Sequence, residues 1–207
     1  MLPVGGYSYS QGLEHAVDCK WVTCAAQAGE WILGLGETSM GRLDLPVLRR
    51  MYRAVQEHDL EALRGWNEFL LANRETAELQ AEDVNMGKAL ARLVNDLYPN
   101  LTWPDFETQP SFALSFARLC VHWCIDINSA CTGFAWIWCE NQAAAAVKLV
   151  PLGQTDGQRI LLRFAQIVPD IVAASSRVDD DAIGNTSPGM AIASAAHARQ
   201  YTRIFRS

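Results

Sequence analysis

Apolar residues recur at intervals of three and four along most of the chain, which is the spacing of one face of an α-helix. One such stretch begins at Ala25, although Gly34 and Gly36 weaken its middle. Asp44 is followed by a proline two residues later and is expected to cap a second helix that extends through Val55. Residues 25–55 are therefore expected to form two helices in succession.

The same spacing continues to the end of the chain. Asp59 is expected to cap a helix with Leu60, Leu63, Trp66 and Leu70 on one face. Further helices are predicted over residues 74–97, 111–124, 128–150, 156–168 and 188–202, and a surface loop with three prolines over 99–110.

Two prolines and one N-cap define the later boundaries. Pro151 ends the helix over 128–150, Thr155 or Asp156 is expected to cap the next, and Pro169 is expected to end or kink it. A sustained strand pattern of alternating residues is absent from the sequence. The fold class predicted is all-α, in a single compact helical domain.

A composition change near residue 177 divides the chain. Residues 1–176 are expected to form the helical core, 177–187 a flexible acidic loop with glycine and proline, and 188–207 a final helix and partner-binding tail. Residues 188–207 hold three arginines and no acidic residue, whereas the whole chain has a net charge of −6. A basic end on an acidic protein favours a charge-complementary protein partner, and three arginines are too few for a nucleic-acid track.

The side chains of this end are typical of interface hot spots. Tyr201, Ile204 and Phe205 supply apolar anchors, and Arg203 and Arg206 supply guanidinium groups. Docking of the last helix on its own core is the alternative. We favour docking on a partner, because ends of chains are otherwise small and polar.

Bulk composition excludes several other classes. Of 207 residues, 50% are hydrophobic and 19% are charged, as in an ordinary folded protein. The richest apolar region, 112–139, is interrupted by charged residues, so no membrane span is expected. The chain opens without a charged leader and apolar core, which favours a cytoplasmic location.

The six cysteines favour buried, reduced thiols over a metal site. None forms a CxxC pair, and Cys120 and Cys124 share a helical face among apolar neighbours while His122 points elsewhere. The four histidines are scattered, and His15 and His197 are each either a metal ligand or, more commonly, a hydrogen-bonded structural residue.

Motifs of catalysis are missing from the sequence, which contains no GxxxxGK[ST], GxSxG or HExxH. Glu75, Glu78 and Glu82 line one face of the helix over 74–97, and Arg74 is expected to pair with Glu78. This face is expected to be solvated helix surface.

Two glycine-bearing segments carry more polar residues than turns require. The first, 2–14, contains Gln11 and Glu14, and the second, 148–158, contains Lys148 and Gln154. Together with three other segments they resemble the UreF family of urease accessory proteins. The resemblance is carried by LPVGGYSYSQGLE at 2–14, RETAEL at 74–79, MG at 86–87, VKLVPLGQTDGQ at 147–158 and HARQYTRIFRS at 197–207.

The resemblance implies an all-α homodimer that has no catalytic activity and holds no tightly bound cofactor. Family members bind UreD (UreH in some organisms) and recruit the GTPase UreG, and the assembled complex delivers nickel to apo-urease. The partner-binding residues that the resemblance and the tail composition imply are Tyr201, Arg203, Ile204, Phe205, Arg206, His197, Tyr7, Tyr9, Glu14, Lys148 and Gln154.

Three departures from the family pattern leave alternatives open. Met1 abuts Leu2 where the family usually has a preceding helical segment, and Gln80 replaces a common arginine. Ala198 replaces a common glutamate, so a carboxylate–histidine pair at His197 is expected to be absent. A truncated or degenerate member without activity is one alternative. The other is a metal-dependent enzyme using His15, the glutamate face or the Cys120/Cys124 pair.

Overall fold

The computed structural model describes residues 4–99, 109–184 and 187–207, and within them every regular element is a helix. The all-α prediction is confirmed. The helices are η1 (Gly6–Ser8), α1 (Leu13–Asp18), α2 (Ala25–Leu35), η2 (Gly36–Asp44), α3 (Leu45–Glu57), α4 (Leu60–Ala72), α5 (Ala77–Leu97), α6 (Phe112–His122), α7 (Ile127–Leu149), α8 (Gln154–Ser175), η3 (Asp180–Ala182) and α9 (Pro188–His197).

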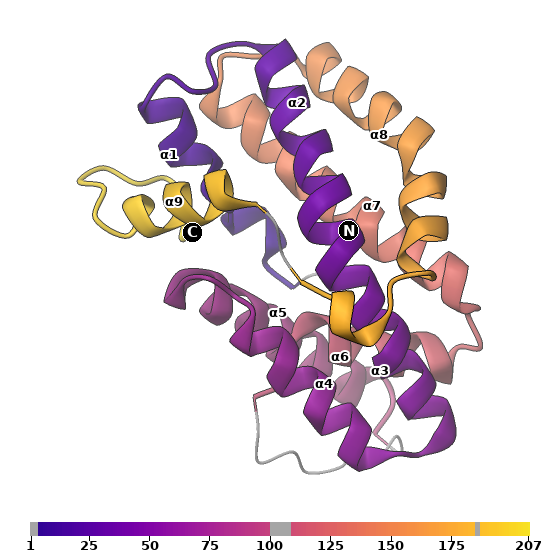
Figure 1. Cartoon of the computed structure of the whole chain (residues 1–207). Coiled ribbons are helices and arrows are strands. Elements are labelled where there is room, and N and C mark those ends of the chain that lie inside the picture. Colours follow the sequence, from indigo (N-terminus) through magenta and orange to yellow (C-terminus); the bar gives the residue numbers. More distant parts are fainter. Residues whose placement is uncertain (1–3, 100–108, 185–186) are drawn as a thin grey trace.

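The first two predicted helices are one continuous rod. Helix α2 passes into α3 through η2, a π-helical turn of nine residues (Figure 1). Gly36 stands where α8 comes closest, because a Cβ on Gly36 would lie 2.8 Å from Phe164 Cε2. The glycine that weakens the helix in isolation therefore permits the packing of α8. Asp44 has helical backbone angles and caps nothing, so that prediction is wrong.

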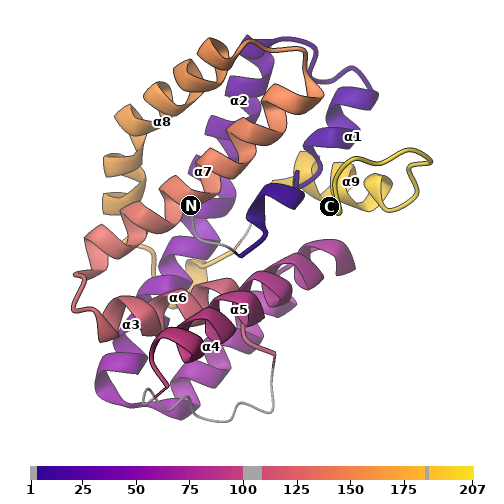
Figure 2. The same ribbon diagram turned by 180° about the vertical axis from the view of Figure 1, so that it is seen from behind.

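Helices α7 and α8 pack against each other and against this rod of α2, η2 and α3 (Figures 1 and 2). Helix α8 begins after Gly153, one or two residues before the predicted caps, and continues through Pro169 to Ser175. The proline removes one backbone donor, but Ile171 and Val172 beyond it are buried in the core, and this burial offsets the loss. Of the two expectations for Pro169, that it ends the helix or kinks it, the first is wrong, because α8 continues to Ser175.

Helices α4, α5 and α6 form the remaining layer. Asp59 caps α4 by accepting a hydrogen bond from Ala62 N at 2.9 Å, which confirms that prediction. Helix α6 ends at His122, so Cys124 lies beyond it and is exposed, unlike the buried Cys120. The predicted loop over 99–110 falls largely outside the described residues.

A buried charge network, which we call the Arg74 cluster (Asp44, Arg74, Asp83), joins these layers. Arg74 Nη2 lies 2.6 Å from Asp44 Oδ1 and 2.7 Å from Asp83 Oδ2. Asp83 also accepts a hydrogen bond from Phe112 N, at the start of α6. Burial lowers the pKa of Arg74, but the two carboxylates outweigh it and the pKa is raised overall. The predicted Arg74–Glu78 pair is replaced by this cluster.

Helices α1 and α9, from opposite ends of the chain, lie side by side at one end of the molecule (Figures 1 and 2). Gly12 permits this contact, because its φ is +81° and a Cβ there would lie 2.9 Å from Ala193 Cβ. Helix α9 ends at His197, earlier than predicted. None of the described helices is long and apolar enough to span a membrane.

The acidic segment after α8 contacts the core. Arg50 donates to Asp180 Oδ1 at 2.9 Å and also to the backbone oxygen of Val178. Gly184 N donates to Arg42 O at 3.2 Å. These bonds hold the described part of the segment against η2 and α3.

Candidate functional site

The tail, residues 198–207, folds back against the beginning of the chain. Ser10 donates to Ser207 O from its backbone nitrogen at 2.7 Å and from its hydroxyl at 2.6 Å. Arg206 N donates to Ser8 O at 2.9 Å. The end of the tail therefore runs beside residues 8–10.

One buried carboxylate holds the middle of the tail. Glu14 is 5% exposed and accepts backbone hydrogen bonds from Ile204 N at 2.6 Å and Phe205 N at 2.9 Å. Hydrogen bonds to a charged acceptor are stronger than those between neutral groups. The contact is made to main-chain groups, so it fixes the path of the tail while leaving its side chains free to face outward.

A buried histidine lies between two carboxylates in the same network. His197 is fully buried, with Nε2 3.0 Å from Glu14 Oε2 and Nδ1 3.0 Å from Glu78 Oε2. Each ring nitrogen of His197 therefore faces a carboxylate oxygen, one from α1 and one from α5. The expectation that His197 lacks a carboxylate partner is therefore wrong: Glu14 and Glu78 occupy the role that Ala198 cannot fill.

Glu78 links this histidine to the tail. Its Oε1 lies 2.7 Å from Arg203 Nη1, on the opposite side of the carboxylate from His197. The prediction of a solvated glutamate face is wrong for Glu78 and for Glu82, which is 5% exposed. We call the group Glu14, Glu78, His197 and the tail backbone the tail site.

Lys148 contacts two aromatic rings beside the tail site. Phe205 is buried, and Lys148 Nζ lies 5.5 Å from the centre of its ring and 5.8 Å from that of Tyr7. These distances are typical of cation–π contacts. Lys148 lies in the last turn of α7, so it ties that helix to both ends of the chain.

The structure thus brings together most of the residues that the sequence singled out. Seven of them belong to the tail or contact it: Glu14, Lys148, His197, Arg203, Ile204, Phe205 and Arg206. Tyr7 is joined to the tail through Lys148. Tyr9 is buried in the core, and Gln154 is exposed at the start of α8, where the described contacts do not join it to the tail. Tyr201 is fully exposed and Ile204 is 70% exposed.

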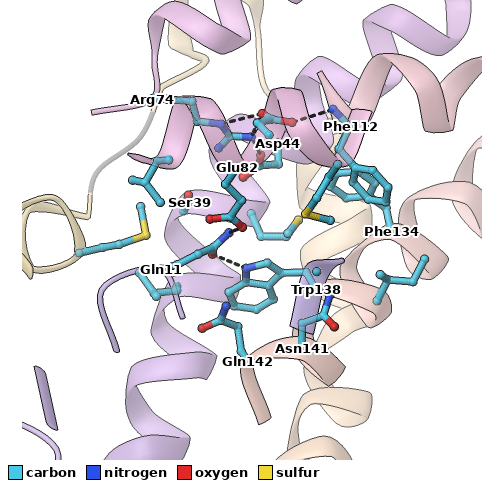
Figure 3. Close-up of a pocket in the computed structure, with 18 residues that line it drawn as sticks. Gln11, Ser39, Asp44, Arg74, Glu82, Phe112, Phe134, Trp138, Asn141 and Gln142 are labelled. Atoms are coloured by element: carbon cyan, nitrogen blue, oxygen red, sulfur yellow. Dashed lines mark hydrogen bonds and ion pairs between the residues drawn. The ribbon is translucent and has the colours of Figure 1, made fainter. Parts of the chain in front are cut away.

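A second acid anchors the end of the tail. Glu82 accepts a hydrogen bond from Ser207 Oγ at 2.7 Å. It also accepts one from Gln11 Nε2 at 2.8 Å, and Gln11 Oε1 accepts one from Trp138 Nε1 at 2.8 Å (Figure 3). Burial raises the pKa of Glu82 to about 7, against the opposing effect of its hydrogen bonds. Its charge therefore changes near neutral pH.

Glu82 lines a cavity of about 70 Å³ between η2, α5 and α7. Figure 3 shows Gln11, Trp138, Asn141 and Gln142 around it. Gln142 Oε1 is buried there without a hydrogen-bond partner among the described residues. The space is large enough for water to reach these polar atoms.

The buried thiols are held in their protonated form. Burial raises the pKa of Cys120 and Cys139 to about 12 and that of Cys131 to about 11. The group of described side chains with the spacing of metal ligands is instead His15, Asp18 and Cys19 on α1.

Sequence reasoning missed Ser10, Glu78 and Glu82 as parts of the site. The partners of Glu78 and Glu82 lie 71 to 125 residues away, so spacing along α5 does not reveal them. The available signal was the excess of polar residues in the segment 2–14. Gln11 and Glu14 both prove to be bound to these distant groups.

Comparisons with known proteins agree on one family. A family model described as UreF matches residues 22–165. A protein of Teredinibacter turnerae named "Urease accessory protein UreF" is 46% identical over 206 residues, covering all of this chain and 93% of the relative. Proteins of the same name from Hahella chejuensis and Alkalilimnicola ehrlichii are 43% and 41% identical over all of this chain and 93% and 91% of their own lengths.

Proposed function

The chain belongs to the UreF family of urease accessory proteins, and on this basis we propose that it acts in urease maturation as a non-catalytic scaffold. In this role it binds UreD/UreH, recruits the GTPase UreG and so supports nickel delivery to apo-urease. It works as a homodimer in the cytoplasm and holds no tightly bound cofactor of its own. Nickel is the cargo of the assembled complex.

The observation that carries this proposal is the arrangement of the tail. Its backbone is fixed by Glu14 and Ser10, while Tyr201 and Ile204 point away from the core. A large exposed aromatic and an exposed isoleucine on a fixed backbone form a preorganised surface. Binding then orders few additional residues, which reduces its entropic cost.

The charged residues of the tail complete the surface. Arg206 is exposed, and Arg203 is partly exposed while paired with Glu78. We assign UreD/UreH to this surface, with Tyr201 and Ile204 as anchors and the arginines at the rim. Phe205 and His197, which the sequence placed among the partner-binding residues, support the surface from beneath, because both are buried.

The test measures the affinity of the full chain for UreD/UreH by titration calorimetry. We expect the double variant Tyr201→Ala/Ile204→Ala to lose at least about tenfold in affinity, as removal of hot-spot residues does. The matched control is Leu162→Ala, because Leu162 is 66% exposed and lies on α8, on the far side of the molecule from α9 (Figures 1 and 2).

Unchanged affinity in the double variant would refute the assigned surface, and an equal loss in the control would show that it is not specific. In cells, the same variants are supplied to a urease operon that lacks its own UreF gene. Nickel-dependent urease activity is expected with the wild type and the control and strongly reduced with the double variant. Activity restored by none of the three would contradict the scaffold role itself.

A further inference from the structure

The outward face of α1 carries three different metal-ligand types within reach of one ion. His15, Asp18 and Cys19 offer ligand atoms that all lie within 4.8 Å of one another, and Cys19 Sγ is 3.3 Å from His15 Nε2. Residues spaced by three and four share one face of a helix. His15 is half-buried and the other two are exposed, so the group is open to solvent.

The distance between sulfur and nitrogen matches a bound ion. Zinc binds sulfur at about 2.3 Å and nitrogen at about 2.0–2.1 Å, so tetrahedral coordination places the two ligand atoms roughly 3.5 Å apart. The observed 3.3 Å requires little movement of either side chain. Asp18, one residue before Cys19 at the end of α1, adds a carboxylate oxygen on the same side.

Local structure holds the ligands in this arrangement. Cys19 N donates to His15 O at 2.9 Å, and Trp21 N and Val22 N both donate to Ala16 O, which turns the chain back over the end of α1. The ring of Trp21 meets the His15 ring edge-on at 5.9 Å and 86°. The imidazole is therefore oriented by an aromatic contact.

We propose that His15, Asp18 and Cys19 form a binding site for a borderline divalent transition-metal cation such as Ni²⁺, Co²⁺ or Zn²⁺. A nitrogen, a sulfur and an oxygen suit these ions, whereas Mg²⁺ and Ca²⁺ take all-oxygen ligand sets. On binding, the Cys19 thiol releases its proton to solvent and the thiolate coordinates the ion, while His15 binds as the neutral imidazole.

The site offers three protein ligands, so a bound ion keeps an open coordination position. Three protein ligands leave at least one coordination position for water or for a ligand from another molecule, as in sites that exchange a bound group. Glu14 on the same helix is committed to the tail site, so the ion does not compete with the tail. That the ion is nickel in transit rests on the proposed function; that the face binds a cation does not.

The test titrates the reduced full chain with Co²⁺, whose thiolate bond gives a charge-transfer absorption, and then displaces it with Ni²⁺ or Zn²⁺. We expect one equivalent with a thiolate band. Loss of an outer contact to a ligand costs about 10–100-fold in metal affinity, so we expect Cys19→Ser to lose at least as much, together with the band. His15→Ala and Asp18→Asn are expected to weaken binding with the band retained.

Cys124→Ser is the matched control, because Cys124 is also an exposed thiol with a histidine nearby in sequence, His122. Its affinity and absorption are expected to equal those of the wild type. No saturable binding, binding unchanged in Cys19→Ser, or an equal loss in Cys124→Ser would each overturn the site.

Unfolding and partner-binding measurements separate this inference from its alternatives. Cys19 is exposed, so Cys19→Ser is expected to keep the thermal unfolding midpoint and the affinity for UreD/UreH of the wild type. Metal binding lost with partner binding retained supports the site even if the scaffold role fails. A lowered unfolding midpoint in Cys19→Ser would show that Cys19 contributes to the stability of the fold. The metal affinity of His15→Ala would then decide whether these residues bind the ion.

Discussion

The Arg74 cluster and the tail site are both buried polar networks between helices, and they differ in what they hold. In the Arg74 cluster a guanidinium joins two carboxylates from η2 and α5, and every contact between them is made by side chains. In the tail site a carboxylate from α1 accepts the backbone N–H groups of residues 204 and 205. The first network joins helices of the core, and the second holds an extended segment onto it.

The difference determines how each network fails. Removing Arg74 leaves two buried carboxylates without their cation, and the core has no way to expose them without unfolding. Removing Glu14 leaves two backbone donors that reach water as soon as the tail detaches, and it leaves Nε2 of the buried His197 without its carboxylate partner while Glu78 still holds Nδ1. The Arg74 cluster is therefore a condition of the fold, whereas the tail site sets the position of one segment.

Breaking the Arg74 cluster should have the largest effect. We expect Arg74→Met to lower the free energy of unfolding by about 3–5 kcal/mol, the usual cost of leaving a buried charge unpaired. Urea denaturation followed by circular dichroism measures this. Arg159→Met is the control, because Arg159 pairs with Asp156 on the exposed face of α8 and its loss should cost under about 0.5 kcal/mol. Equal stability of the two variants would contradict the comparison.

Breaking the tail site should cost less and act locally. We expect Glu14→Ala to lower the free energy of unfolding by about 2–3 kcal/mol, because two backbone hydrogen bonds and the contact with His197 Nε2 are lost while the tail regains water. The helical circular dichroism should be unchanged, and carboxypeptidase should remove the tail faster. The exposed Glu30, replaced by alanine, serves as the control. Loss of helical signal in Glu14→Ala would show that the tail site is part of the core.

The anchoring of the tail should also depend on pH through Glu82, which lies between the two networks and binds Ser207 at the end of the tail. Its pKa is about 7 in the folded chain against 4.5 for the free residue, so the folded state holds its proton more tightly. The stability that Glu82 contributes is complete below about pH 4.5 and is lost as pH rises through 7.

Denaturation at a series of pH values checks this. Glu82→Gln should remove a decline on the order of 2–3 kcal/mol between pH 4.5 and 8, since one pKa unit corresponds to about 1.4 kcal/mol. Gln11, Ser207, Arg74 and Asp83 surround the carboxylate and are unchanged in the variant. Parallel pH profiles for the two proteins would contradict the assignment.

The smallest effect on stability is expected from the outward side chains of the tail. Tyr201 is fully exposed, so Tyr201→Ala should change the free energy of unfolding by less than about 0.5 kcal/mol. Phe205→Ala, its buried neighbour in the tail, should cost several times more. Thermal unfolding of both variants measures the contrast, and similar losses would show that the tail does not divide into an inner and an outer face.

Sequence reasoning succeeded where the determinants are local. The cap of α4 at Asp59 follows from neighbours a few residues away and is observed. Of the predicted apolar stripe of α4, Leu63 and Leu70 are buried, whereas Leu60 is exposed. Sequence reasoning failed at Asp44 and at the end of α8, which was expected before Pro169, because packing of distant helices overrides the local preference there. The carboxylates of α5 look like a solvated face along the chain, because nothing in their spacing reveals Arg203, His197 or Ser207.

The residues of the tail site were likewise predictable from local sequence, but the way in which they meet was not. The aromatic and basic character of the tail predicted a docking segment, and the polar excess of 2–14 identified Glu14. That the two meet depends on α1 and α9 packing together from opposite ends of the chain, which a single sequence does not encode in any local pattern.

Amide hydrogen exchange at Ile204 and Phe205 in the free wild-type chain tests the central claim, that Glu14 fixes the backbone of the tail. The account predicts slow exchange at both amides, comparable with Ser10, whose N–H is bound to Ser207, and rapid exchange at both in Glu14→Ala. Exchange at the rate of an unstructured peptide in the wild type, or protection that survives the loss of Glu14, would contradict it.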